Sequence, residues 1–177
     1  MIRSFAYDAL PGRVVFGEGA LSRLAQEVDT LGFRRALVLT TPQQTEQGDA
    51  AAAILGPRAA GRFSKARMHV PVDIVDEAGA TVAESGADCL LAIGGGSTTG
   101  LAKALALRSG PPIIAVPTTY AGSEMTPIWG MTEGGVKTTG RDARVLPRLV
   151  VYDPDLLTTL PPEVVATSGN ERHRALR

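Results

Sequence analysis

Residues 92–103 read AIGGGSTTGLAK, and this stretch decides the fold that the rest of the chain must fit. The apolar run 89–93 leads into it, as expected of a parallel strand buried on both faces. Gly94, Gly95 and Gly96 allow a tight turn and a close approach of backbone to ligand, and Ser97 is predicted to cap the helix that follows. Free N–H groups at a helix start favour an anion, so the segment predicts a phosphate cradle. A bend without a ligand is the alternative.

Strands alternate with helices of about a dozen residues on both sides of this turn. Strands are predicted at residues 13–16, 36–40, 62–63, 112–117 and 148–152, and helices at 19–31, 43–55, 72–85 and 97–107. The alternation predicts an α/β fold: a Rossmann-like parallel sheet with flanking helices. Within residues 129–139, Gly134 and Gly135 separate two short runs and predict a β-hairpin. Asp153 is predicted to cap a short helical turn.

Composition points to a small-molecule partner. The 177 residues carry 18 Lys and Arg against 18 Asp and Glu, so net charge gives no reason to expect nucleic acid or an anionic membrane as a partner. No apolar run is long enough for a signal peptide or a membrane span. The single cysteine, Cys89, falls in a predicted buried strand and is expected to be an inert core thiol. A chain without disulfides fits a cytoplasmic location.

Three segments are predicted to converge at the carboxyl ends of strands, where such sheets bind phosphates. They are residues 40–41, 94–97 and 118–124, all rich in hydroxyl side chains or glycine. These groups hydrogen-bond phosphate and sugar oxygens without crowding them. Ordinary loop capping is the alternative for Thr118 and Thr119. The glycine segment matches neither the GxGxxG fingerprint nor a P-loop.

The titratable residues near these segments give no catalytic assignment. Lys103 lies about two turns into the predicted helix and is expected to be solvated or paired. Glu124 is a candidate acid or base, but we expect a solvated loop carboxylate. His69 precedes Val70-Pro71 and is expected at the surface or at a strand end.

Three segments together resemble the iron-containing alcohol dehydrogenase superfamily, and more narrowly its maleylacetate reductase branch. They are GGGSTTGLAK (94–103), PTTYAGSEMTPIWGMTEGGVKTTGRDARVLP (117–147) and VYDPDLLTTLPPEVVATSG (151–169). The superfamily motif reads GGGSxxDxAK, and Gly100 stands here in place of its aspartate. That departure is typical of the maleylacetate reductase branch.

The resemblance implies NAD(P)H-dependent reduction of maleylacetate to 3-oxoadipate, a step in the bacterial breakdown of aromatic compounds. It also implies a dehydroquinate synthase-like N-terminal α/β domain, a helical C-terminal domain, an active site between them and a homodimer. The residues carried over as cofactor-binding are Gly94, Gly95, Gly96 and Ser97 for the pyrophosphate, Thr118, Thr119 and Ser123 for the adenine-ribose and pyrophosphate side, and Lys137 for a ribose. Thr41 occupies a position where NAD-preferring relatives carry an aspartate, so either NADH or NADPH is expected.

The substrate implied by the resemblance carries two carboxylates and needs cations. Lys137, Arg141 and Arg144 are the candidates, and a solvated loop is the alternative. Two other functions remain open: a catalytically silent nucleotide-binding fragment, and another activity of the superfamily such as that of glycerol dehydrogenase.

The pattern of the family is lost near the end of the sequence. We expect a dinucleotide-binding α/β domain over residues 1–160 and a divergent tail over 161–177, as in a truncated reading frame. The tail reads NERHRALR at 170–177, where the family continues into its helical domain. The metal ligands of that domain are therefore not expected in this chain, and His173 is not expected to match the first family histidine.

Overall fold

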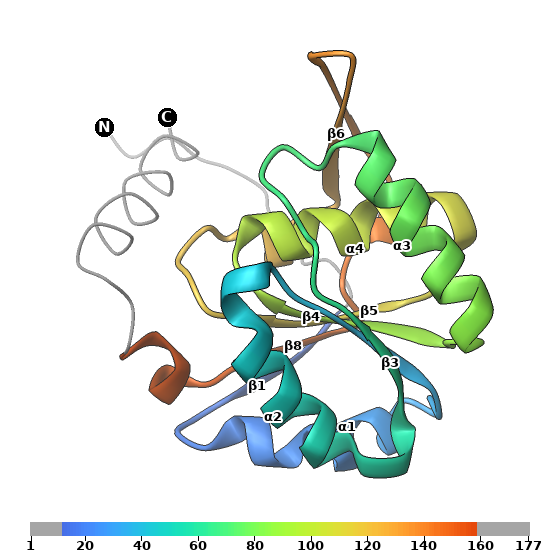
Figure 1. Ribbon diagram of the computed structural model, residues 1–177. Helices are drawn as coiled ribbons and strands as arrows, with labels where there is room; N and C mark the ends of the chain where they lie inside the picture. Colours follow the sequence, from blue (N-terminus) through green and yellow to red (C-terminus); the bar gives the residue numbers. More distant parts are fainter. Residues whose placement is uncertain (1–11, 159–177) are drawn as a thin grey trace, which may run out of the picture.

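The computed structural model describes residues 12–158, which are built around a six-stranded parallel sheet (Figure 1). In spatial order its strands are β1 (Arg13–Phe16), β8 (Leu149–Tyr152), β5 (Ile113–Pro117), β4 (Cys89–Gly94), β2 (Ala36–Leu39) and β3 (Ala59–Phe63). The α-helices are α1 (Leu24–Thr30), α2 (Thr45–Leu55), α3 (Val72–Ser85) and α4 (Gly96–Ser109). The strands β6 (Ile128–Glu133) and β7 (Val136–Arg141) form an antiparallel hairpin. The predicted Rossmann-like α/β fold with a hairpin is confirmed.

Helices cover both faces of the sheet and create two hydrophobic cores. Along β4, Leu90 and Ala92 face the core shared with α3 and α4. Leu91 and Ile93 point the other way, into the core shared with α1 and α2. This alternation is the period of two expected of a strand, and it explains why a strand covered on both faces reads as one continuous apolar run.

Short 3₁₀ segments replace the first turns of two predicted helices. The helix predicted at 19–31 begins as a 3₁₀ turn, Ala20–Arg23, before α1. Gly19 precedes that turn with a φ of 66°, and the Asp153 carboxylate accepts hydrogen bonds from the N–H groups of Gly19 and Leu21. Asp153 also accepts from the Asp155 N–H, which confirms its predicted capping role. The end of β8 thus fixes the start of the first helical segment.

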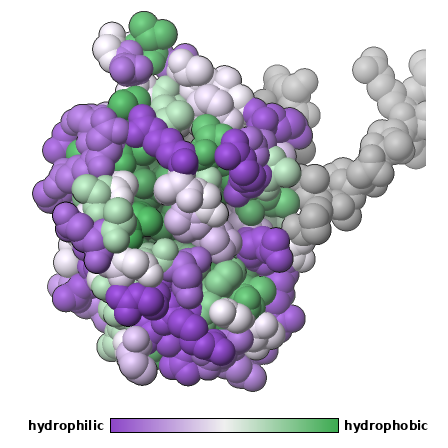
Figure 2. Space-filling model, turned by 90° about the vertical axis from the view of Figure 1, so that its right-hand side faces the viewer, coloured by the Kyte–Doolittle hydropathy of each residue, from purple (hydrophilic) through white to green (hydrophobic). Residues whose placement is uncertain are grey.

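Hydrophilic side chains cover much of the face shown in Figure 2, and the apolar ones form separate patches. Within residues 12–158, no helix has both the length and the apolar character that crossing a membrane requires. The predicted boundary between residues 160 and 161, and the tail that contains His173, lie outside the described residues.

Candidate functional site

The candidate site lies where the strand order reverses. From β2 the chain moves outward to β3 and then returns across β2 to β4, so the loops after β2 and β4 leave in opposite directions. Ligands of open α/β sheets bind in the crevice that such a reversal creates. The three predicted segments do meet here. Gln44 Nε2 donates to Thr118 Oγ1 at 2.8 Å, and the Thr118 N–H donates to the Gly94 carbonyl at 2.9 Å.

The glycine turn between β4 and α4 is shaped by close neighbours. Gly94 has a φ of 147°, and a Cβ there would lie 2.5 Å from both Gln44 Oε1 and Thr98 Oγ1. At Gly95 a Cβ would lie 3.0 Å from Thr119 Cγ2. Gly94 therefore requires glycine, because its φ is unfavourable for other residues and side-chain oxygens occupy the space, whereas a Cβ at Gly95 would require Thr119 to shift.

The predicted cap at Ser97 is wrong by two residues. The N-cap of α4 is Gly95, with extended backbone and no side-chain cap, and the helix starts at Gly96. The three glycines let the chain enter the helix two residues earlier than a cap at Ser97 would. Ser97 instead lies in the first turn and lines a pocket.

The turn leaves polar groups in need of partners. The first N–H groups of a helix have no acceptor within the helix, and α4 has no capping side chain to supply one. The hydroxyl of Thr98, which is fully buried, has no hydrogen-bond partner among the described residues and lies beside the space above Gly94. A turn with unpaired donors and no room for a Cβ fits an oxyanion such as a phosphate.

Gln44 was missed by the sequence reasoning. Its side chain accepts a hydrogen bond from Thr41 Oγ1 at 3.0 Å and donates to Thr118. It therefore connects the ends of β2 and β5 across Gly94. The spacing of Thr41 and Gln44, a hydroxyl residue followed three positions later by an amide, is typical of helix starts and could have identified it.

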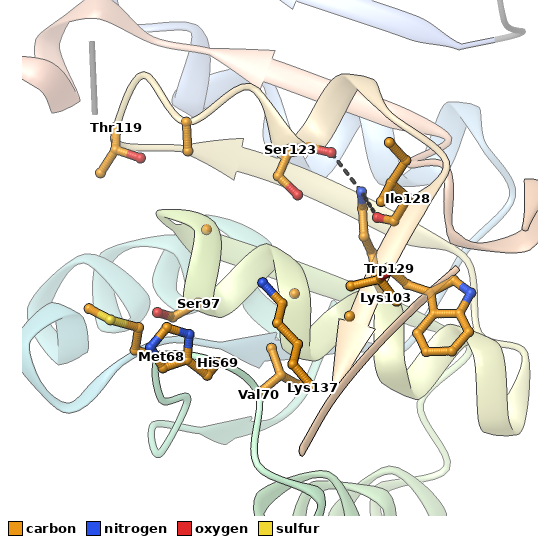
Figure 3. A pocket seen from close by; sticks show the side chains of 15 residues that line it. Met68, His69, Val70, Ser97, Lys103, Thr119, Ser123, Ile128, Trp129 and Lys137 are labelled. Atoms are coloured by element: carbon orange, nitrogen blue, oxygen red, sulfur yellow. Dashed lines mark hydrogen bonds between the residues drawn. The ribbon is translucent and has the colours of Figure 1, made fainter. Parts of the chain in front are cut away.

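A cavity of about 520 Å³ extends from the start of α4 to the hairpin (Figure 3). Its walls come from the loop before α3, the first turns of α4, the loop after β5 and the hairpin. Five predicted cofactor residues line it: Gly96, Ser97, Thr119, Ser123 and Lys137. The other four, Thr41, Gly94, Gly95 and Thr118, belong to the adjoining strand ends. The side chain of Lys137 extends from β7 into the pocket.

Lys103 was expected to be solvated or paired, and the structure excludes the first alternative. Its side chain is 1% exposed, and Nζ donates to the carbonyls of Ser123, Thr126 and Ile128 at 2.7, 2.7 and 2.8 Å. Burial lowers the pKa of Lys103 to about 8, against the opposing effect of the Glu124 charge. Lys103 therefore fixes the segment between β5 and β6, which forms one pocket wall (Figure 3).

Of three other single residues near these segments, one differs from its expected environment. Glu124 is not solvated: it is 5% exposed, and its Oε1 accepts a hydrogen bond from the Tyr152 hydroxyl at 2.8 Å. His69 lies at the surface as predicted, on the pocket wall. Cys89 is fully buried, and burial, with a smaller effect of Asp88, raises the pKa of its thiol, which confirms an inert core thiol.

The structure brings one of the three predicted substrate cations to the pocket. Arg144 pairs with Asp142 at 2.7 Å and donates to the Leu107 carbonyl. Hydrogen bonding to Arg144 lowers the pKa of Asp142. Arg141 lines a different cavity. Lys137 alone of the three lines the pocket beside the glycine turn. Within residues 12–158, no group of three or more His, Cys, Asp or Glu side chains could hold a metal ion.

The comparisons with known proteins agree with this geometry. A family model described as iron-containing alcohol dehydrogenase matches residues 11–154. Maleylacetate reductase from Burkholderia cepacia is 56% identical over 168 residues, covering 95% of this chain and 48% of that protein. Maleylacetate reductase from Sphingobium indicum is 60% identical over 165 residues, covering 93% and 47%. The crystal structure of maleylacetate reductase from Agrobacterium tumefaciens superposes with a TM-score of 0.91 at 50% identity, covering 95% and 48%. The chain spans about half the length of the curated relatives it matches.

Proposed function

Because the chain belongs to the iron-containing alcohol dehydrogenase family, we propose that it is the dinucleotide-binding part of a maleylacetate reductase. Relatives of that name share 56% and 60% of its residues over nearly its whole length. The reaction proposed is NAD(P)H-dependent reduction of maleylacetate to 3-oxoadipate, in the degradation of aromatic compounds. We place the domain at residues 1–160, in a homodimer in the cytoplasm that binds a small dicarboxylate and no nucleic acid.

One observation carries the cofactor assignment: the glycine turn opens into the crevice where strand order reverses and leaves buried and helix-terminal donors unpaired. In the proposal the pyrophosphate lies against Gly94, Gly95, Gly96 and Ser97. Thr118, Thr119 and Ser123 line the side next to it, Lys137 reaches a ribose and Thr41 lies near the adenosine ribose. The bound cofactor would supply the hydride, and these residues would bind and orient the cofactor.

Conjugate hydride addition places negative charge on the ketone oxygen of the substrate, so the site needs donors there. Lys137 is the cation that extends into the pocket from the hairpin. Because the proposal places Lys137 at a ribose, we leave the donor to the ketone oxygen and the catalytic acid unassigned. The described residues do not provide a metal site, and no step here depends on one.

A catalytically silent nucleotide-binding module is the second candidate. The described residues supply groups for binding the cofactor, whereas no catalytic acid is assigned among them. Another activity of the family, such as glycerol dehydrogenase, is disfavoured by the identity to maleylacetate reductases.

Two measurements separate these functions. NADH and NADPH are titrated against the chain by fluorescence. Oxidation of NADH or NADPH is then followed with maleylacetate, and reduction of NAD⁺ is followed with glycerol. Binding together with oxidation by maleylacetate supports the reductase. Binding without turnover supports the silent module, and absence of binding refutes both.

A further inference from the structure

Two consecutive residues on the pocket wall have backbone conformations that non-glycine residues rarely adopt. The φ angles of His69 and Val70 are 66° and 49°, and no other non-glycine residue in 12–158 has a positive φ. Valine is branched at Cβ, which makes this conformation especially unfavourable for it. Such a turn persists only where the surrounding structure holds it.

Contacts on three sides hold this turn. The Val70 N–H donates to the Arg67 carbonyl at 3.3 Å, and the Val70 carbonyl accepts from the N–H of Thr132 in β6 at 3.1 Å. The Val70 side chain is 6% exposed and belongs to the core beneath α3 and α4. A Cβ built on Gly100 would lie 2.7 Å from Val70 Cγ2, closer than real Cβ contacts come. The turn therefore rests directly on the backbone of α4 and needs glycine at position 100.

Glycine in the interior of α4 weakens the helix relative to alanine. The packing of Val70 gives a physical reason for Gly100, at the position where the superfamily motif has an aspartate. Any longer side chain at position 100 would push the turn away from α4, and His69 would move with it. The contact between Gly100 and Val70 thus determines where His69 lies.

His69 and Lys137 enter the same pocket from different elements, the loop before α3 and the hairpin (Figure 3). Both side chains line this pocket together with Ser97 of α4. Neither side chain has a hydrogen-bond partner within residues 12–158. Imidazole and ammonium groups both donate N–H, and donors of this kind form strong hydrogen bonds with phosphate and carboxylate oxygens.

We propose that His69 is a binding residue that, together with Lys137, donates to an oxyanion of the ligand, and that the Gly100–Val70 contact holds it in place. The oxyanion is a phosphate oxygen of the dinucleotide or a carboxylate oxygen of the organic acid. This assignment rests on the proposed function. It adds His69 to the anion site and names the Gly100–Val70 contact as the one that positions His69.

The direct test is NMR of the histidine ring protons during titration with inorganic pyrophosphate and, separately, with maleate. The chain has two histidines, and His69→Ala identifies the His69 signal by its loss. We expect the His69 signal to move with at least one probe, and His69→Ala to weaken binding of that probe about tenfold, the effect of losing one charge-assisted hydrogen bond. The matched control is Arg67→Gln, which removes a charge from the same loop at a residue that does not line the pocket; we expect it to change affinity by less than about twofold.

A shift with pyrophosphate assigns His69 to the cofactor, and a shift with maleate assigns it to the substrate. An unmoved His69 signal with both probes, or equal affinities of wild type and His69→Ala, overturns the proposal. NADH titration of the wild type is scored separately. Failure to bind NADH counts against the proposed function, while the two anion titrations still decide the role of His69.

The positioning contact is tested by a double-mutant cycle of Gly100→Ala and Val70→Ala, read by melting temperature and by probe affinity. Gly100→Ala alone is expected to weaken probe binding about tenfold because it displaces the turn that carries His69. Val70→Ala removes the clashing methyl groups, so the double variant should bind more tightly than Gly100→Ala alone. Strictly additive effects of the two substitutions on both readouts would refute the contact as the positioning device.

Discussion

Replacing the buried lysine by methionine should change how the stability of this protein depends on pH. In the folded chain the pKa of Lys103 is lowered to about 8 from an ordinary value of 10.5, because burial disfavours its charged form. Between those two pH values the unfolded chain holds a proton that the folded chain has released. The free energy of unfolding therefore rises with pH in this window.

The size of the effect follows from the two pKa values. Each tenfold change in proton affinity corresponds to about 1.4 kcal/mol, so the lysine should raise the free energy of unfolding by about 2.5 kcal/mol between pH 7 and pH 10. The Lys103→Met variant lacks the titrating group, so its free energy of unfolding should not show this rise. The substitution also removes the donor to three partly buried carbonyls, at a cost of about 1 kcal/mol for each hydrogen bond lost.

The assay is urea unfolding from pH 7 to pH 10, followed by the fluorescence of Trp129, the single tryptophan, which lies next to Ile128 in the segment that Lys103 holds. The difference between wild type and Lys103→Met should grow with pH. Lys65→Met, at an exposed lysine, is the matched control and should parallel the wild type. A difference that stays constant or shrinks would refute the reasoning. NMR titration of the Lys103 side chain in the wild type tests the same point without any variant.

Four further outcomes are expected from the site. Gly94→Ala places a Cβ 2.5 Å from two side-chain oxygens at a positive φ; we expect a loss of about 1–3 kcal/mol in urea unfolding and loss of NADH binding by fluorescence. Gln44→Ala removes the local hydrogen bond from Thr41 and the hydrogen bond to Thr118 across the crevice and should cost about 1 kcal/mol for each, with weaker NADH binding; unchanged affinity would show that this bridge does not shape the cofactor site. Thr41→Asp introduces a charge that repels a 2′-phosphate, so the ratio of NADPH to NADH dissociation constants should rise about tenfold, and an unaltered ratio would contradict the placement of the adenosine ribose. Glu27 is buried beside Arg13, and the hydrogen bond from Arg13 lowers its pKa; its contribution to stability should persist at neutral pH and disappear as the pH falls through that lowered value, a dependence that Glu27→Gln should lack in acid unfolding.

The sequence was sufficient to predict those elements whose structure depends mainly on their own residues. Helix α3 occupies the predicted residues 72–85, because four apolar side chains at helical spacing lie between a proline and a left-handed glycine. The hairpin follows from Gly134 and Gly135, both of which have positive φ. In both cases the deciding interactions are local, so the pattern alone determines the structure.

The errors arose where a residue's environment comes from elsewhere in the chain. Lys103 looks like a surface lysine in a helix, and only the segment after β5 supplies the carbonyls that bury it. Glu124 likewise looks solvated until β8 brings Tyr152 to it. The partners of Gln44 and the strain at Val70 depend on strand order, which the sequence pattern did not specify.

Helix α4 controls both the binding surface and its walls. Its first turn presents N–H groups without partners. Gly100, in its second turn, packs against the turn that carries His69. Lys103, about one helical turn further along, binds the segment on the opposite side of the pocket. Substitutions on the buried sides of α4 therefore move pocket walls that they do not themselves form. Substitutions at the exposed tip of the hairpin, such as Val136→Thr, lack this connection. If the pocket is organised in this way, ligand affinity must respond more strongly to the buried positions of α4 than to the hairpin tip, even where the losses of stability are equal.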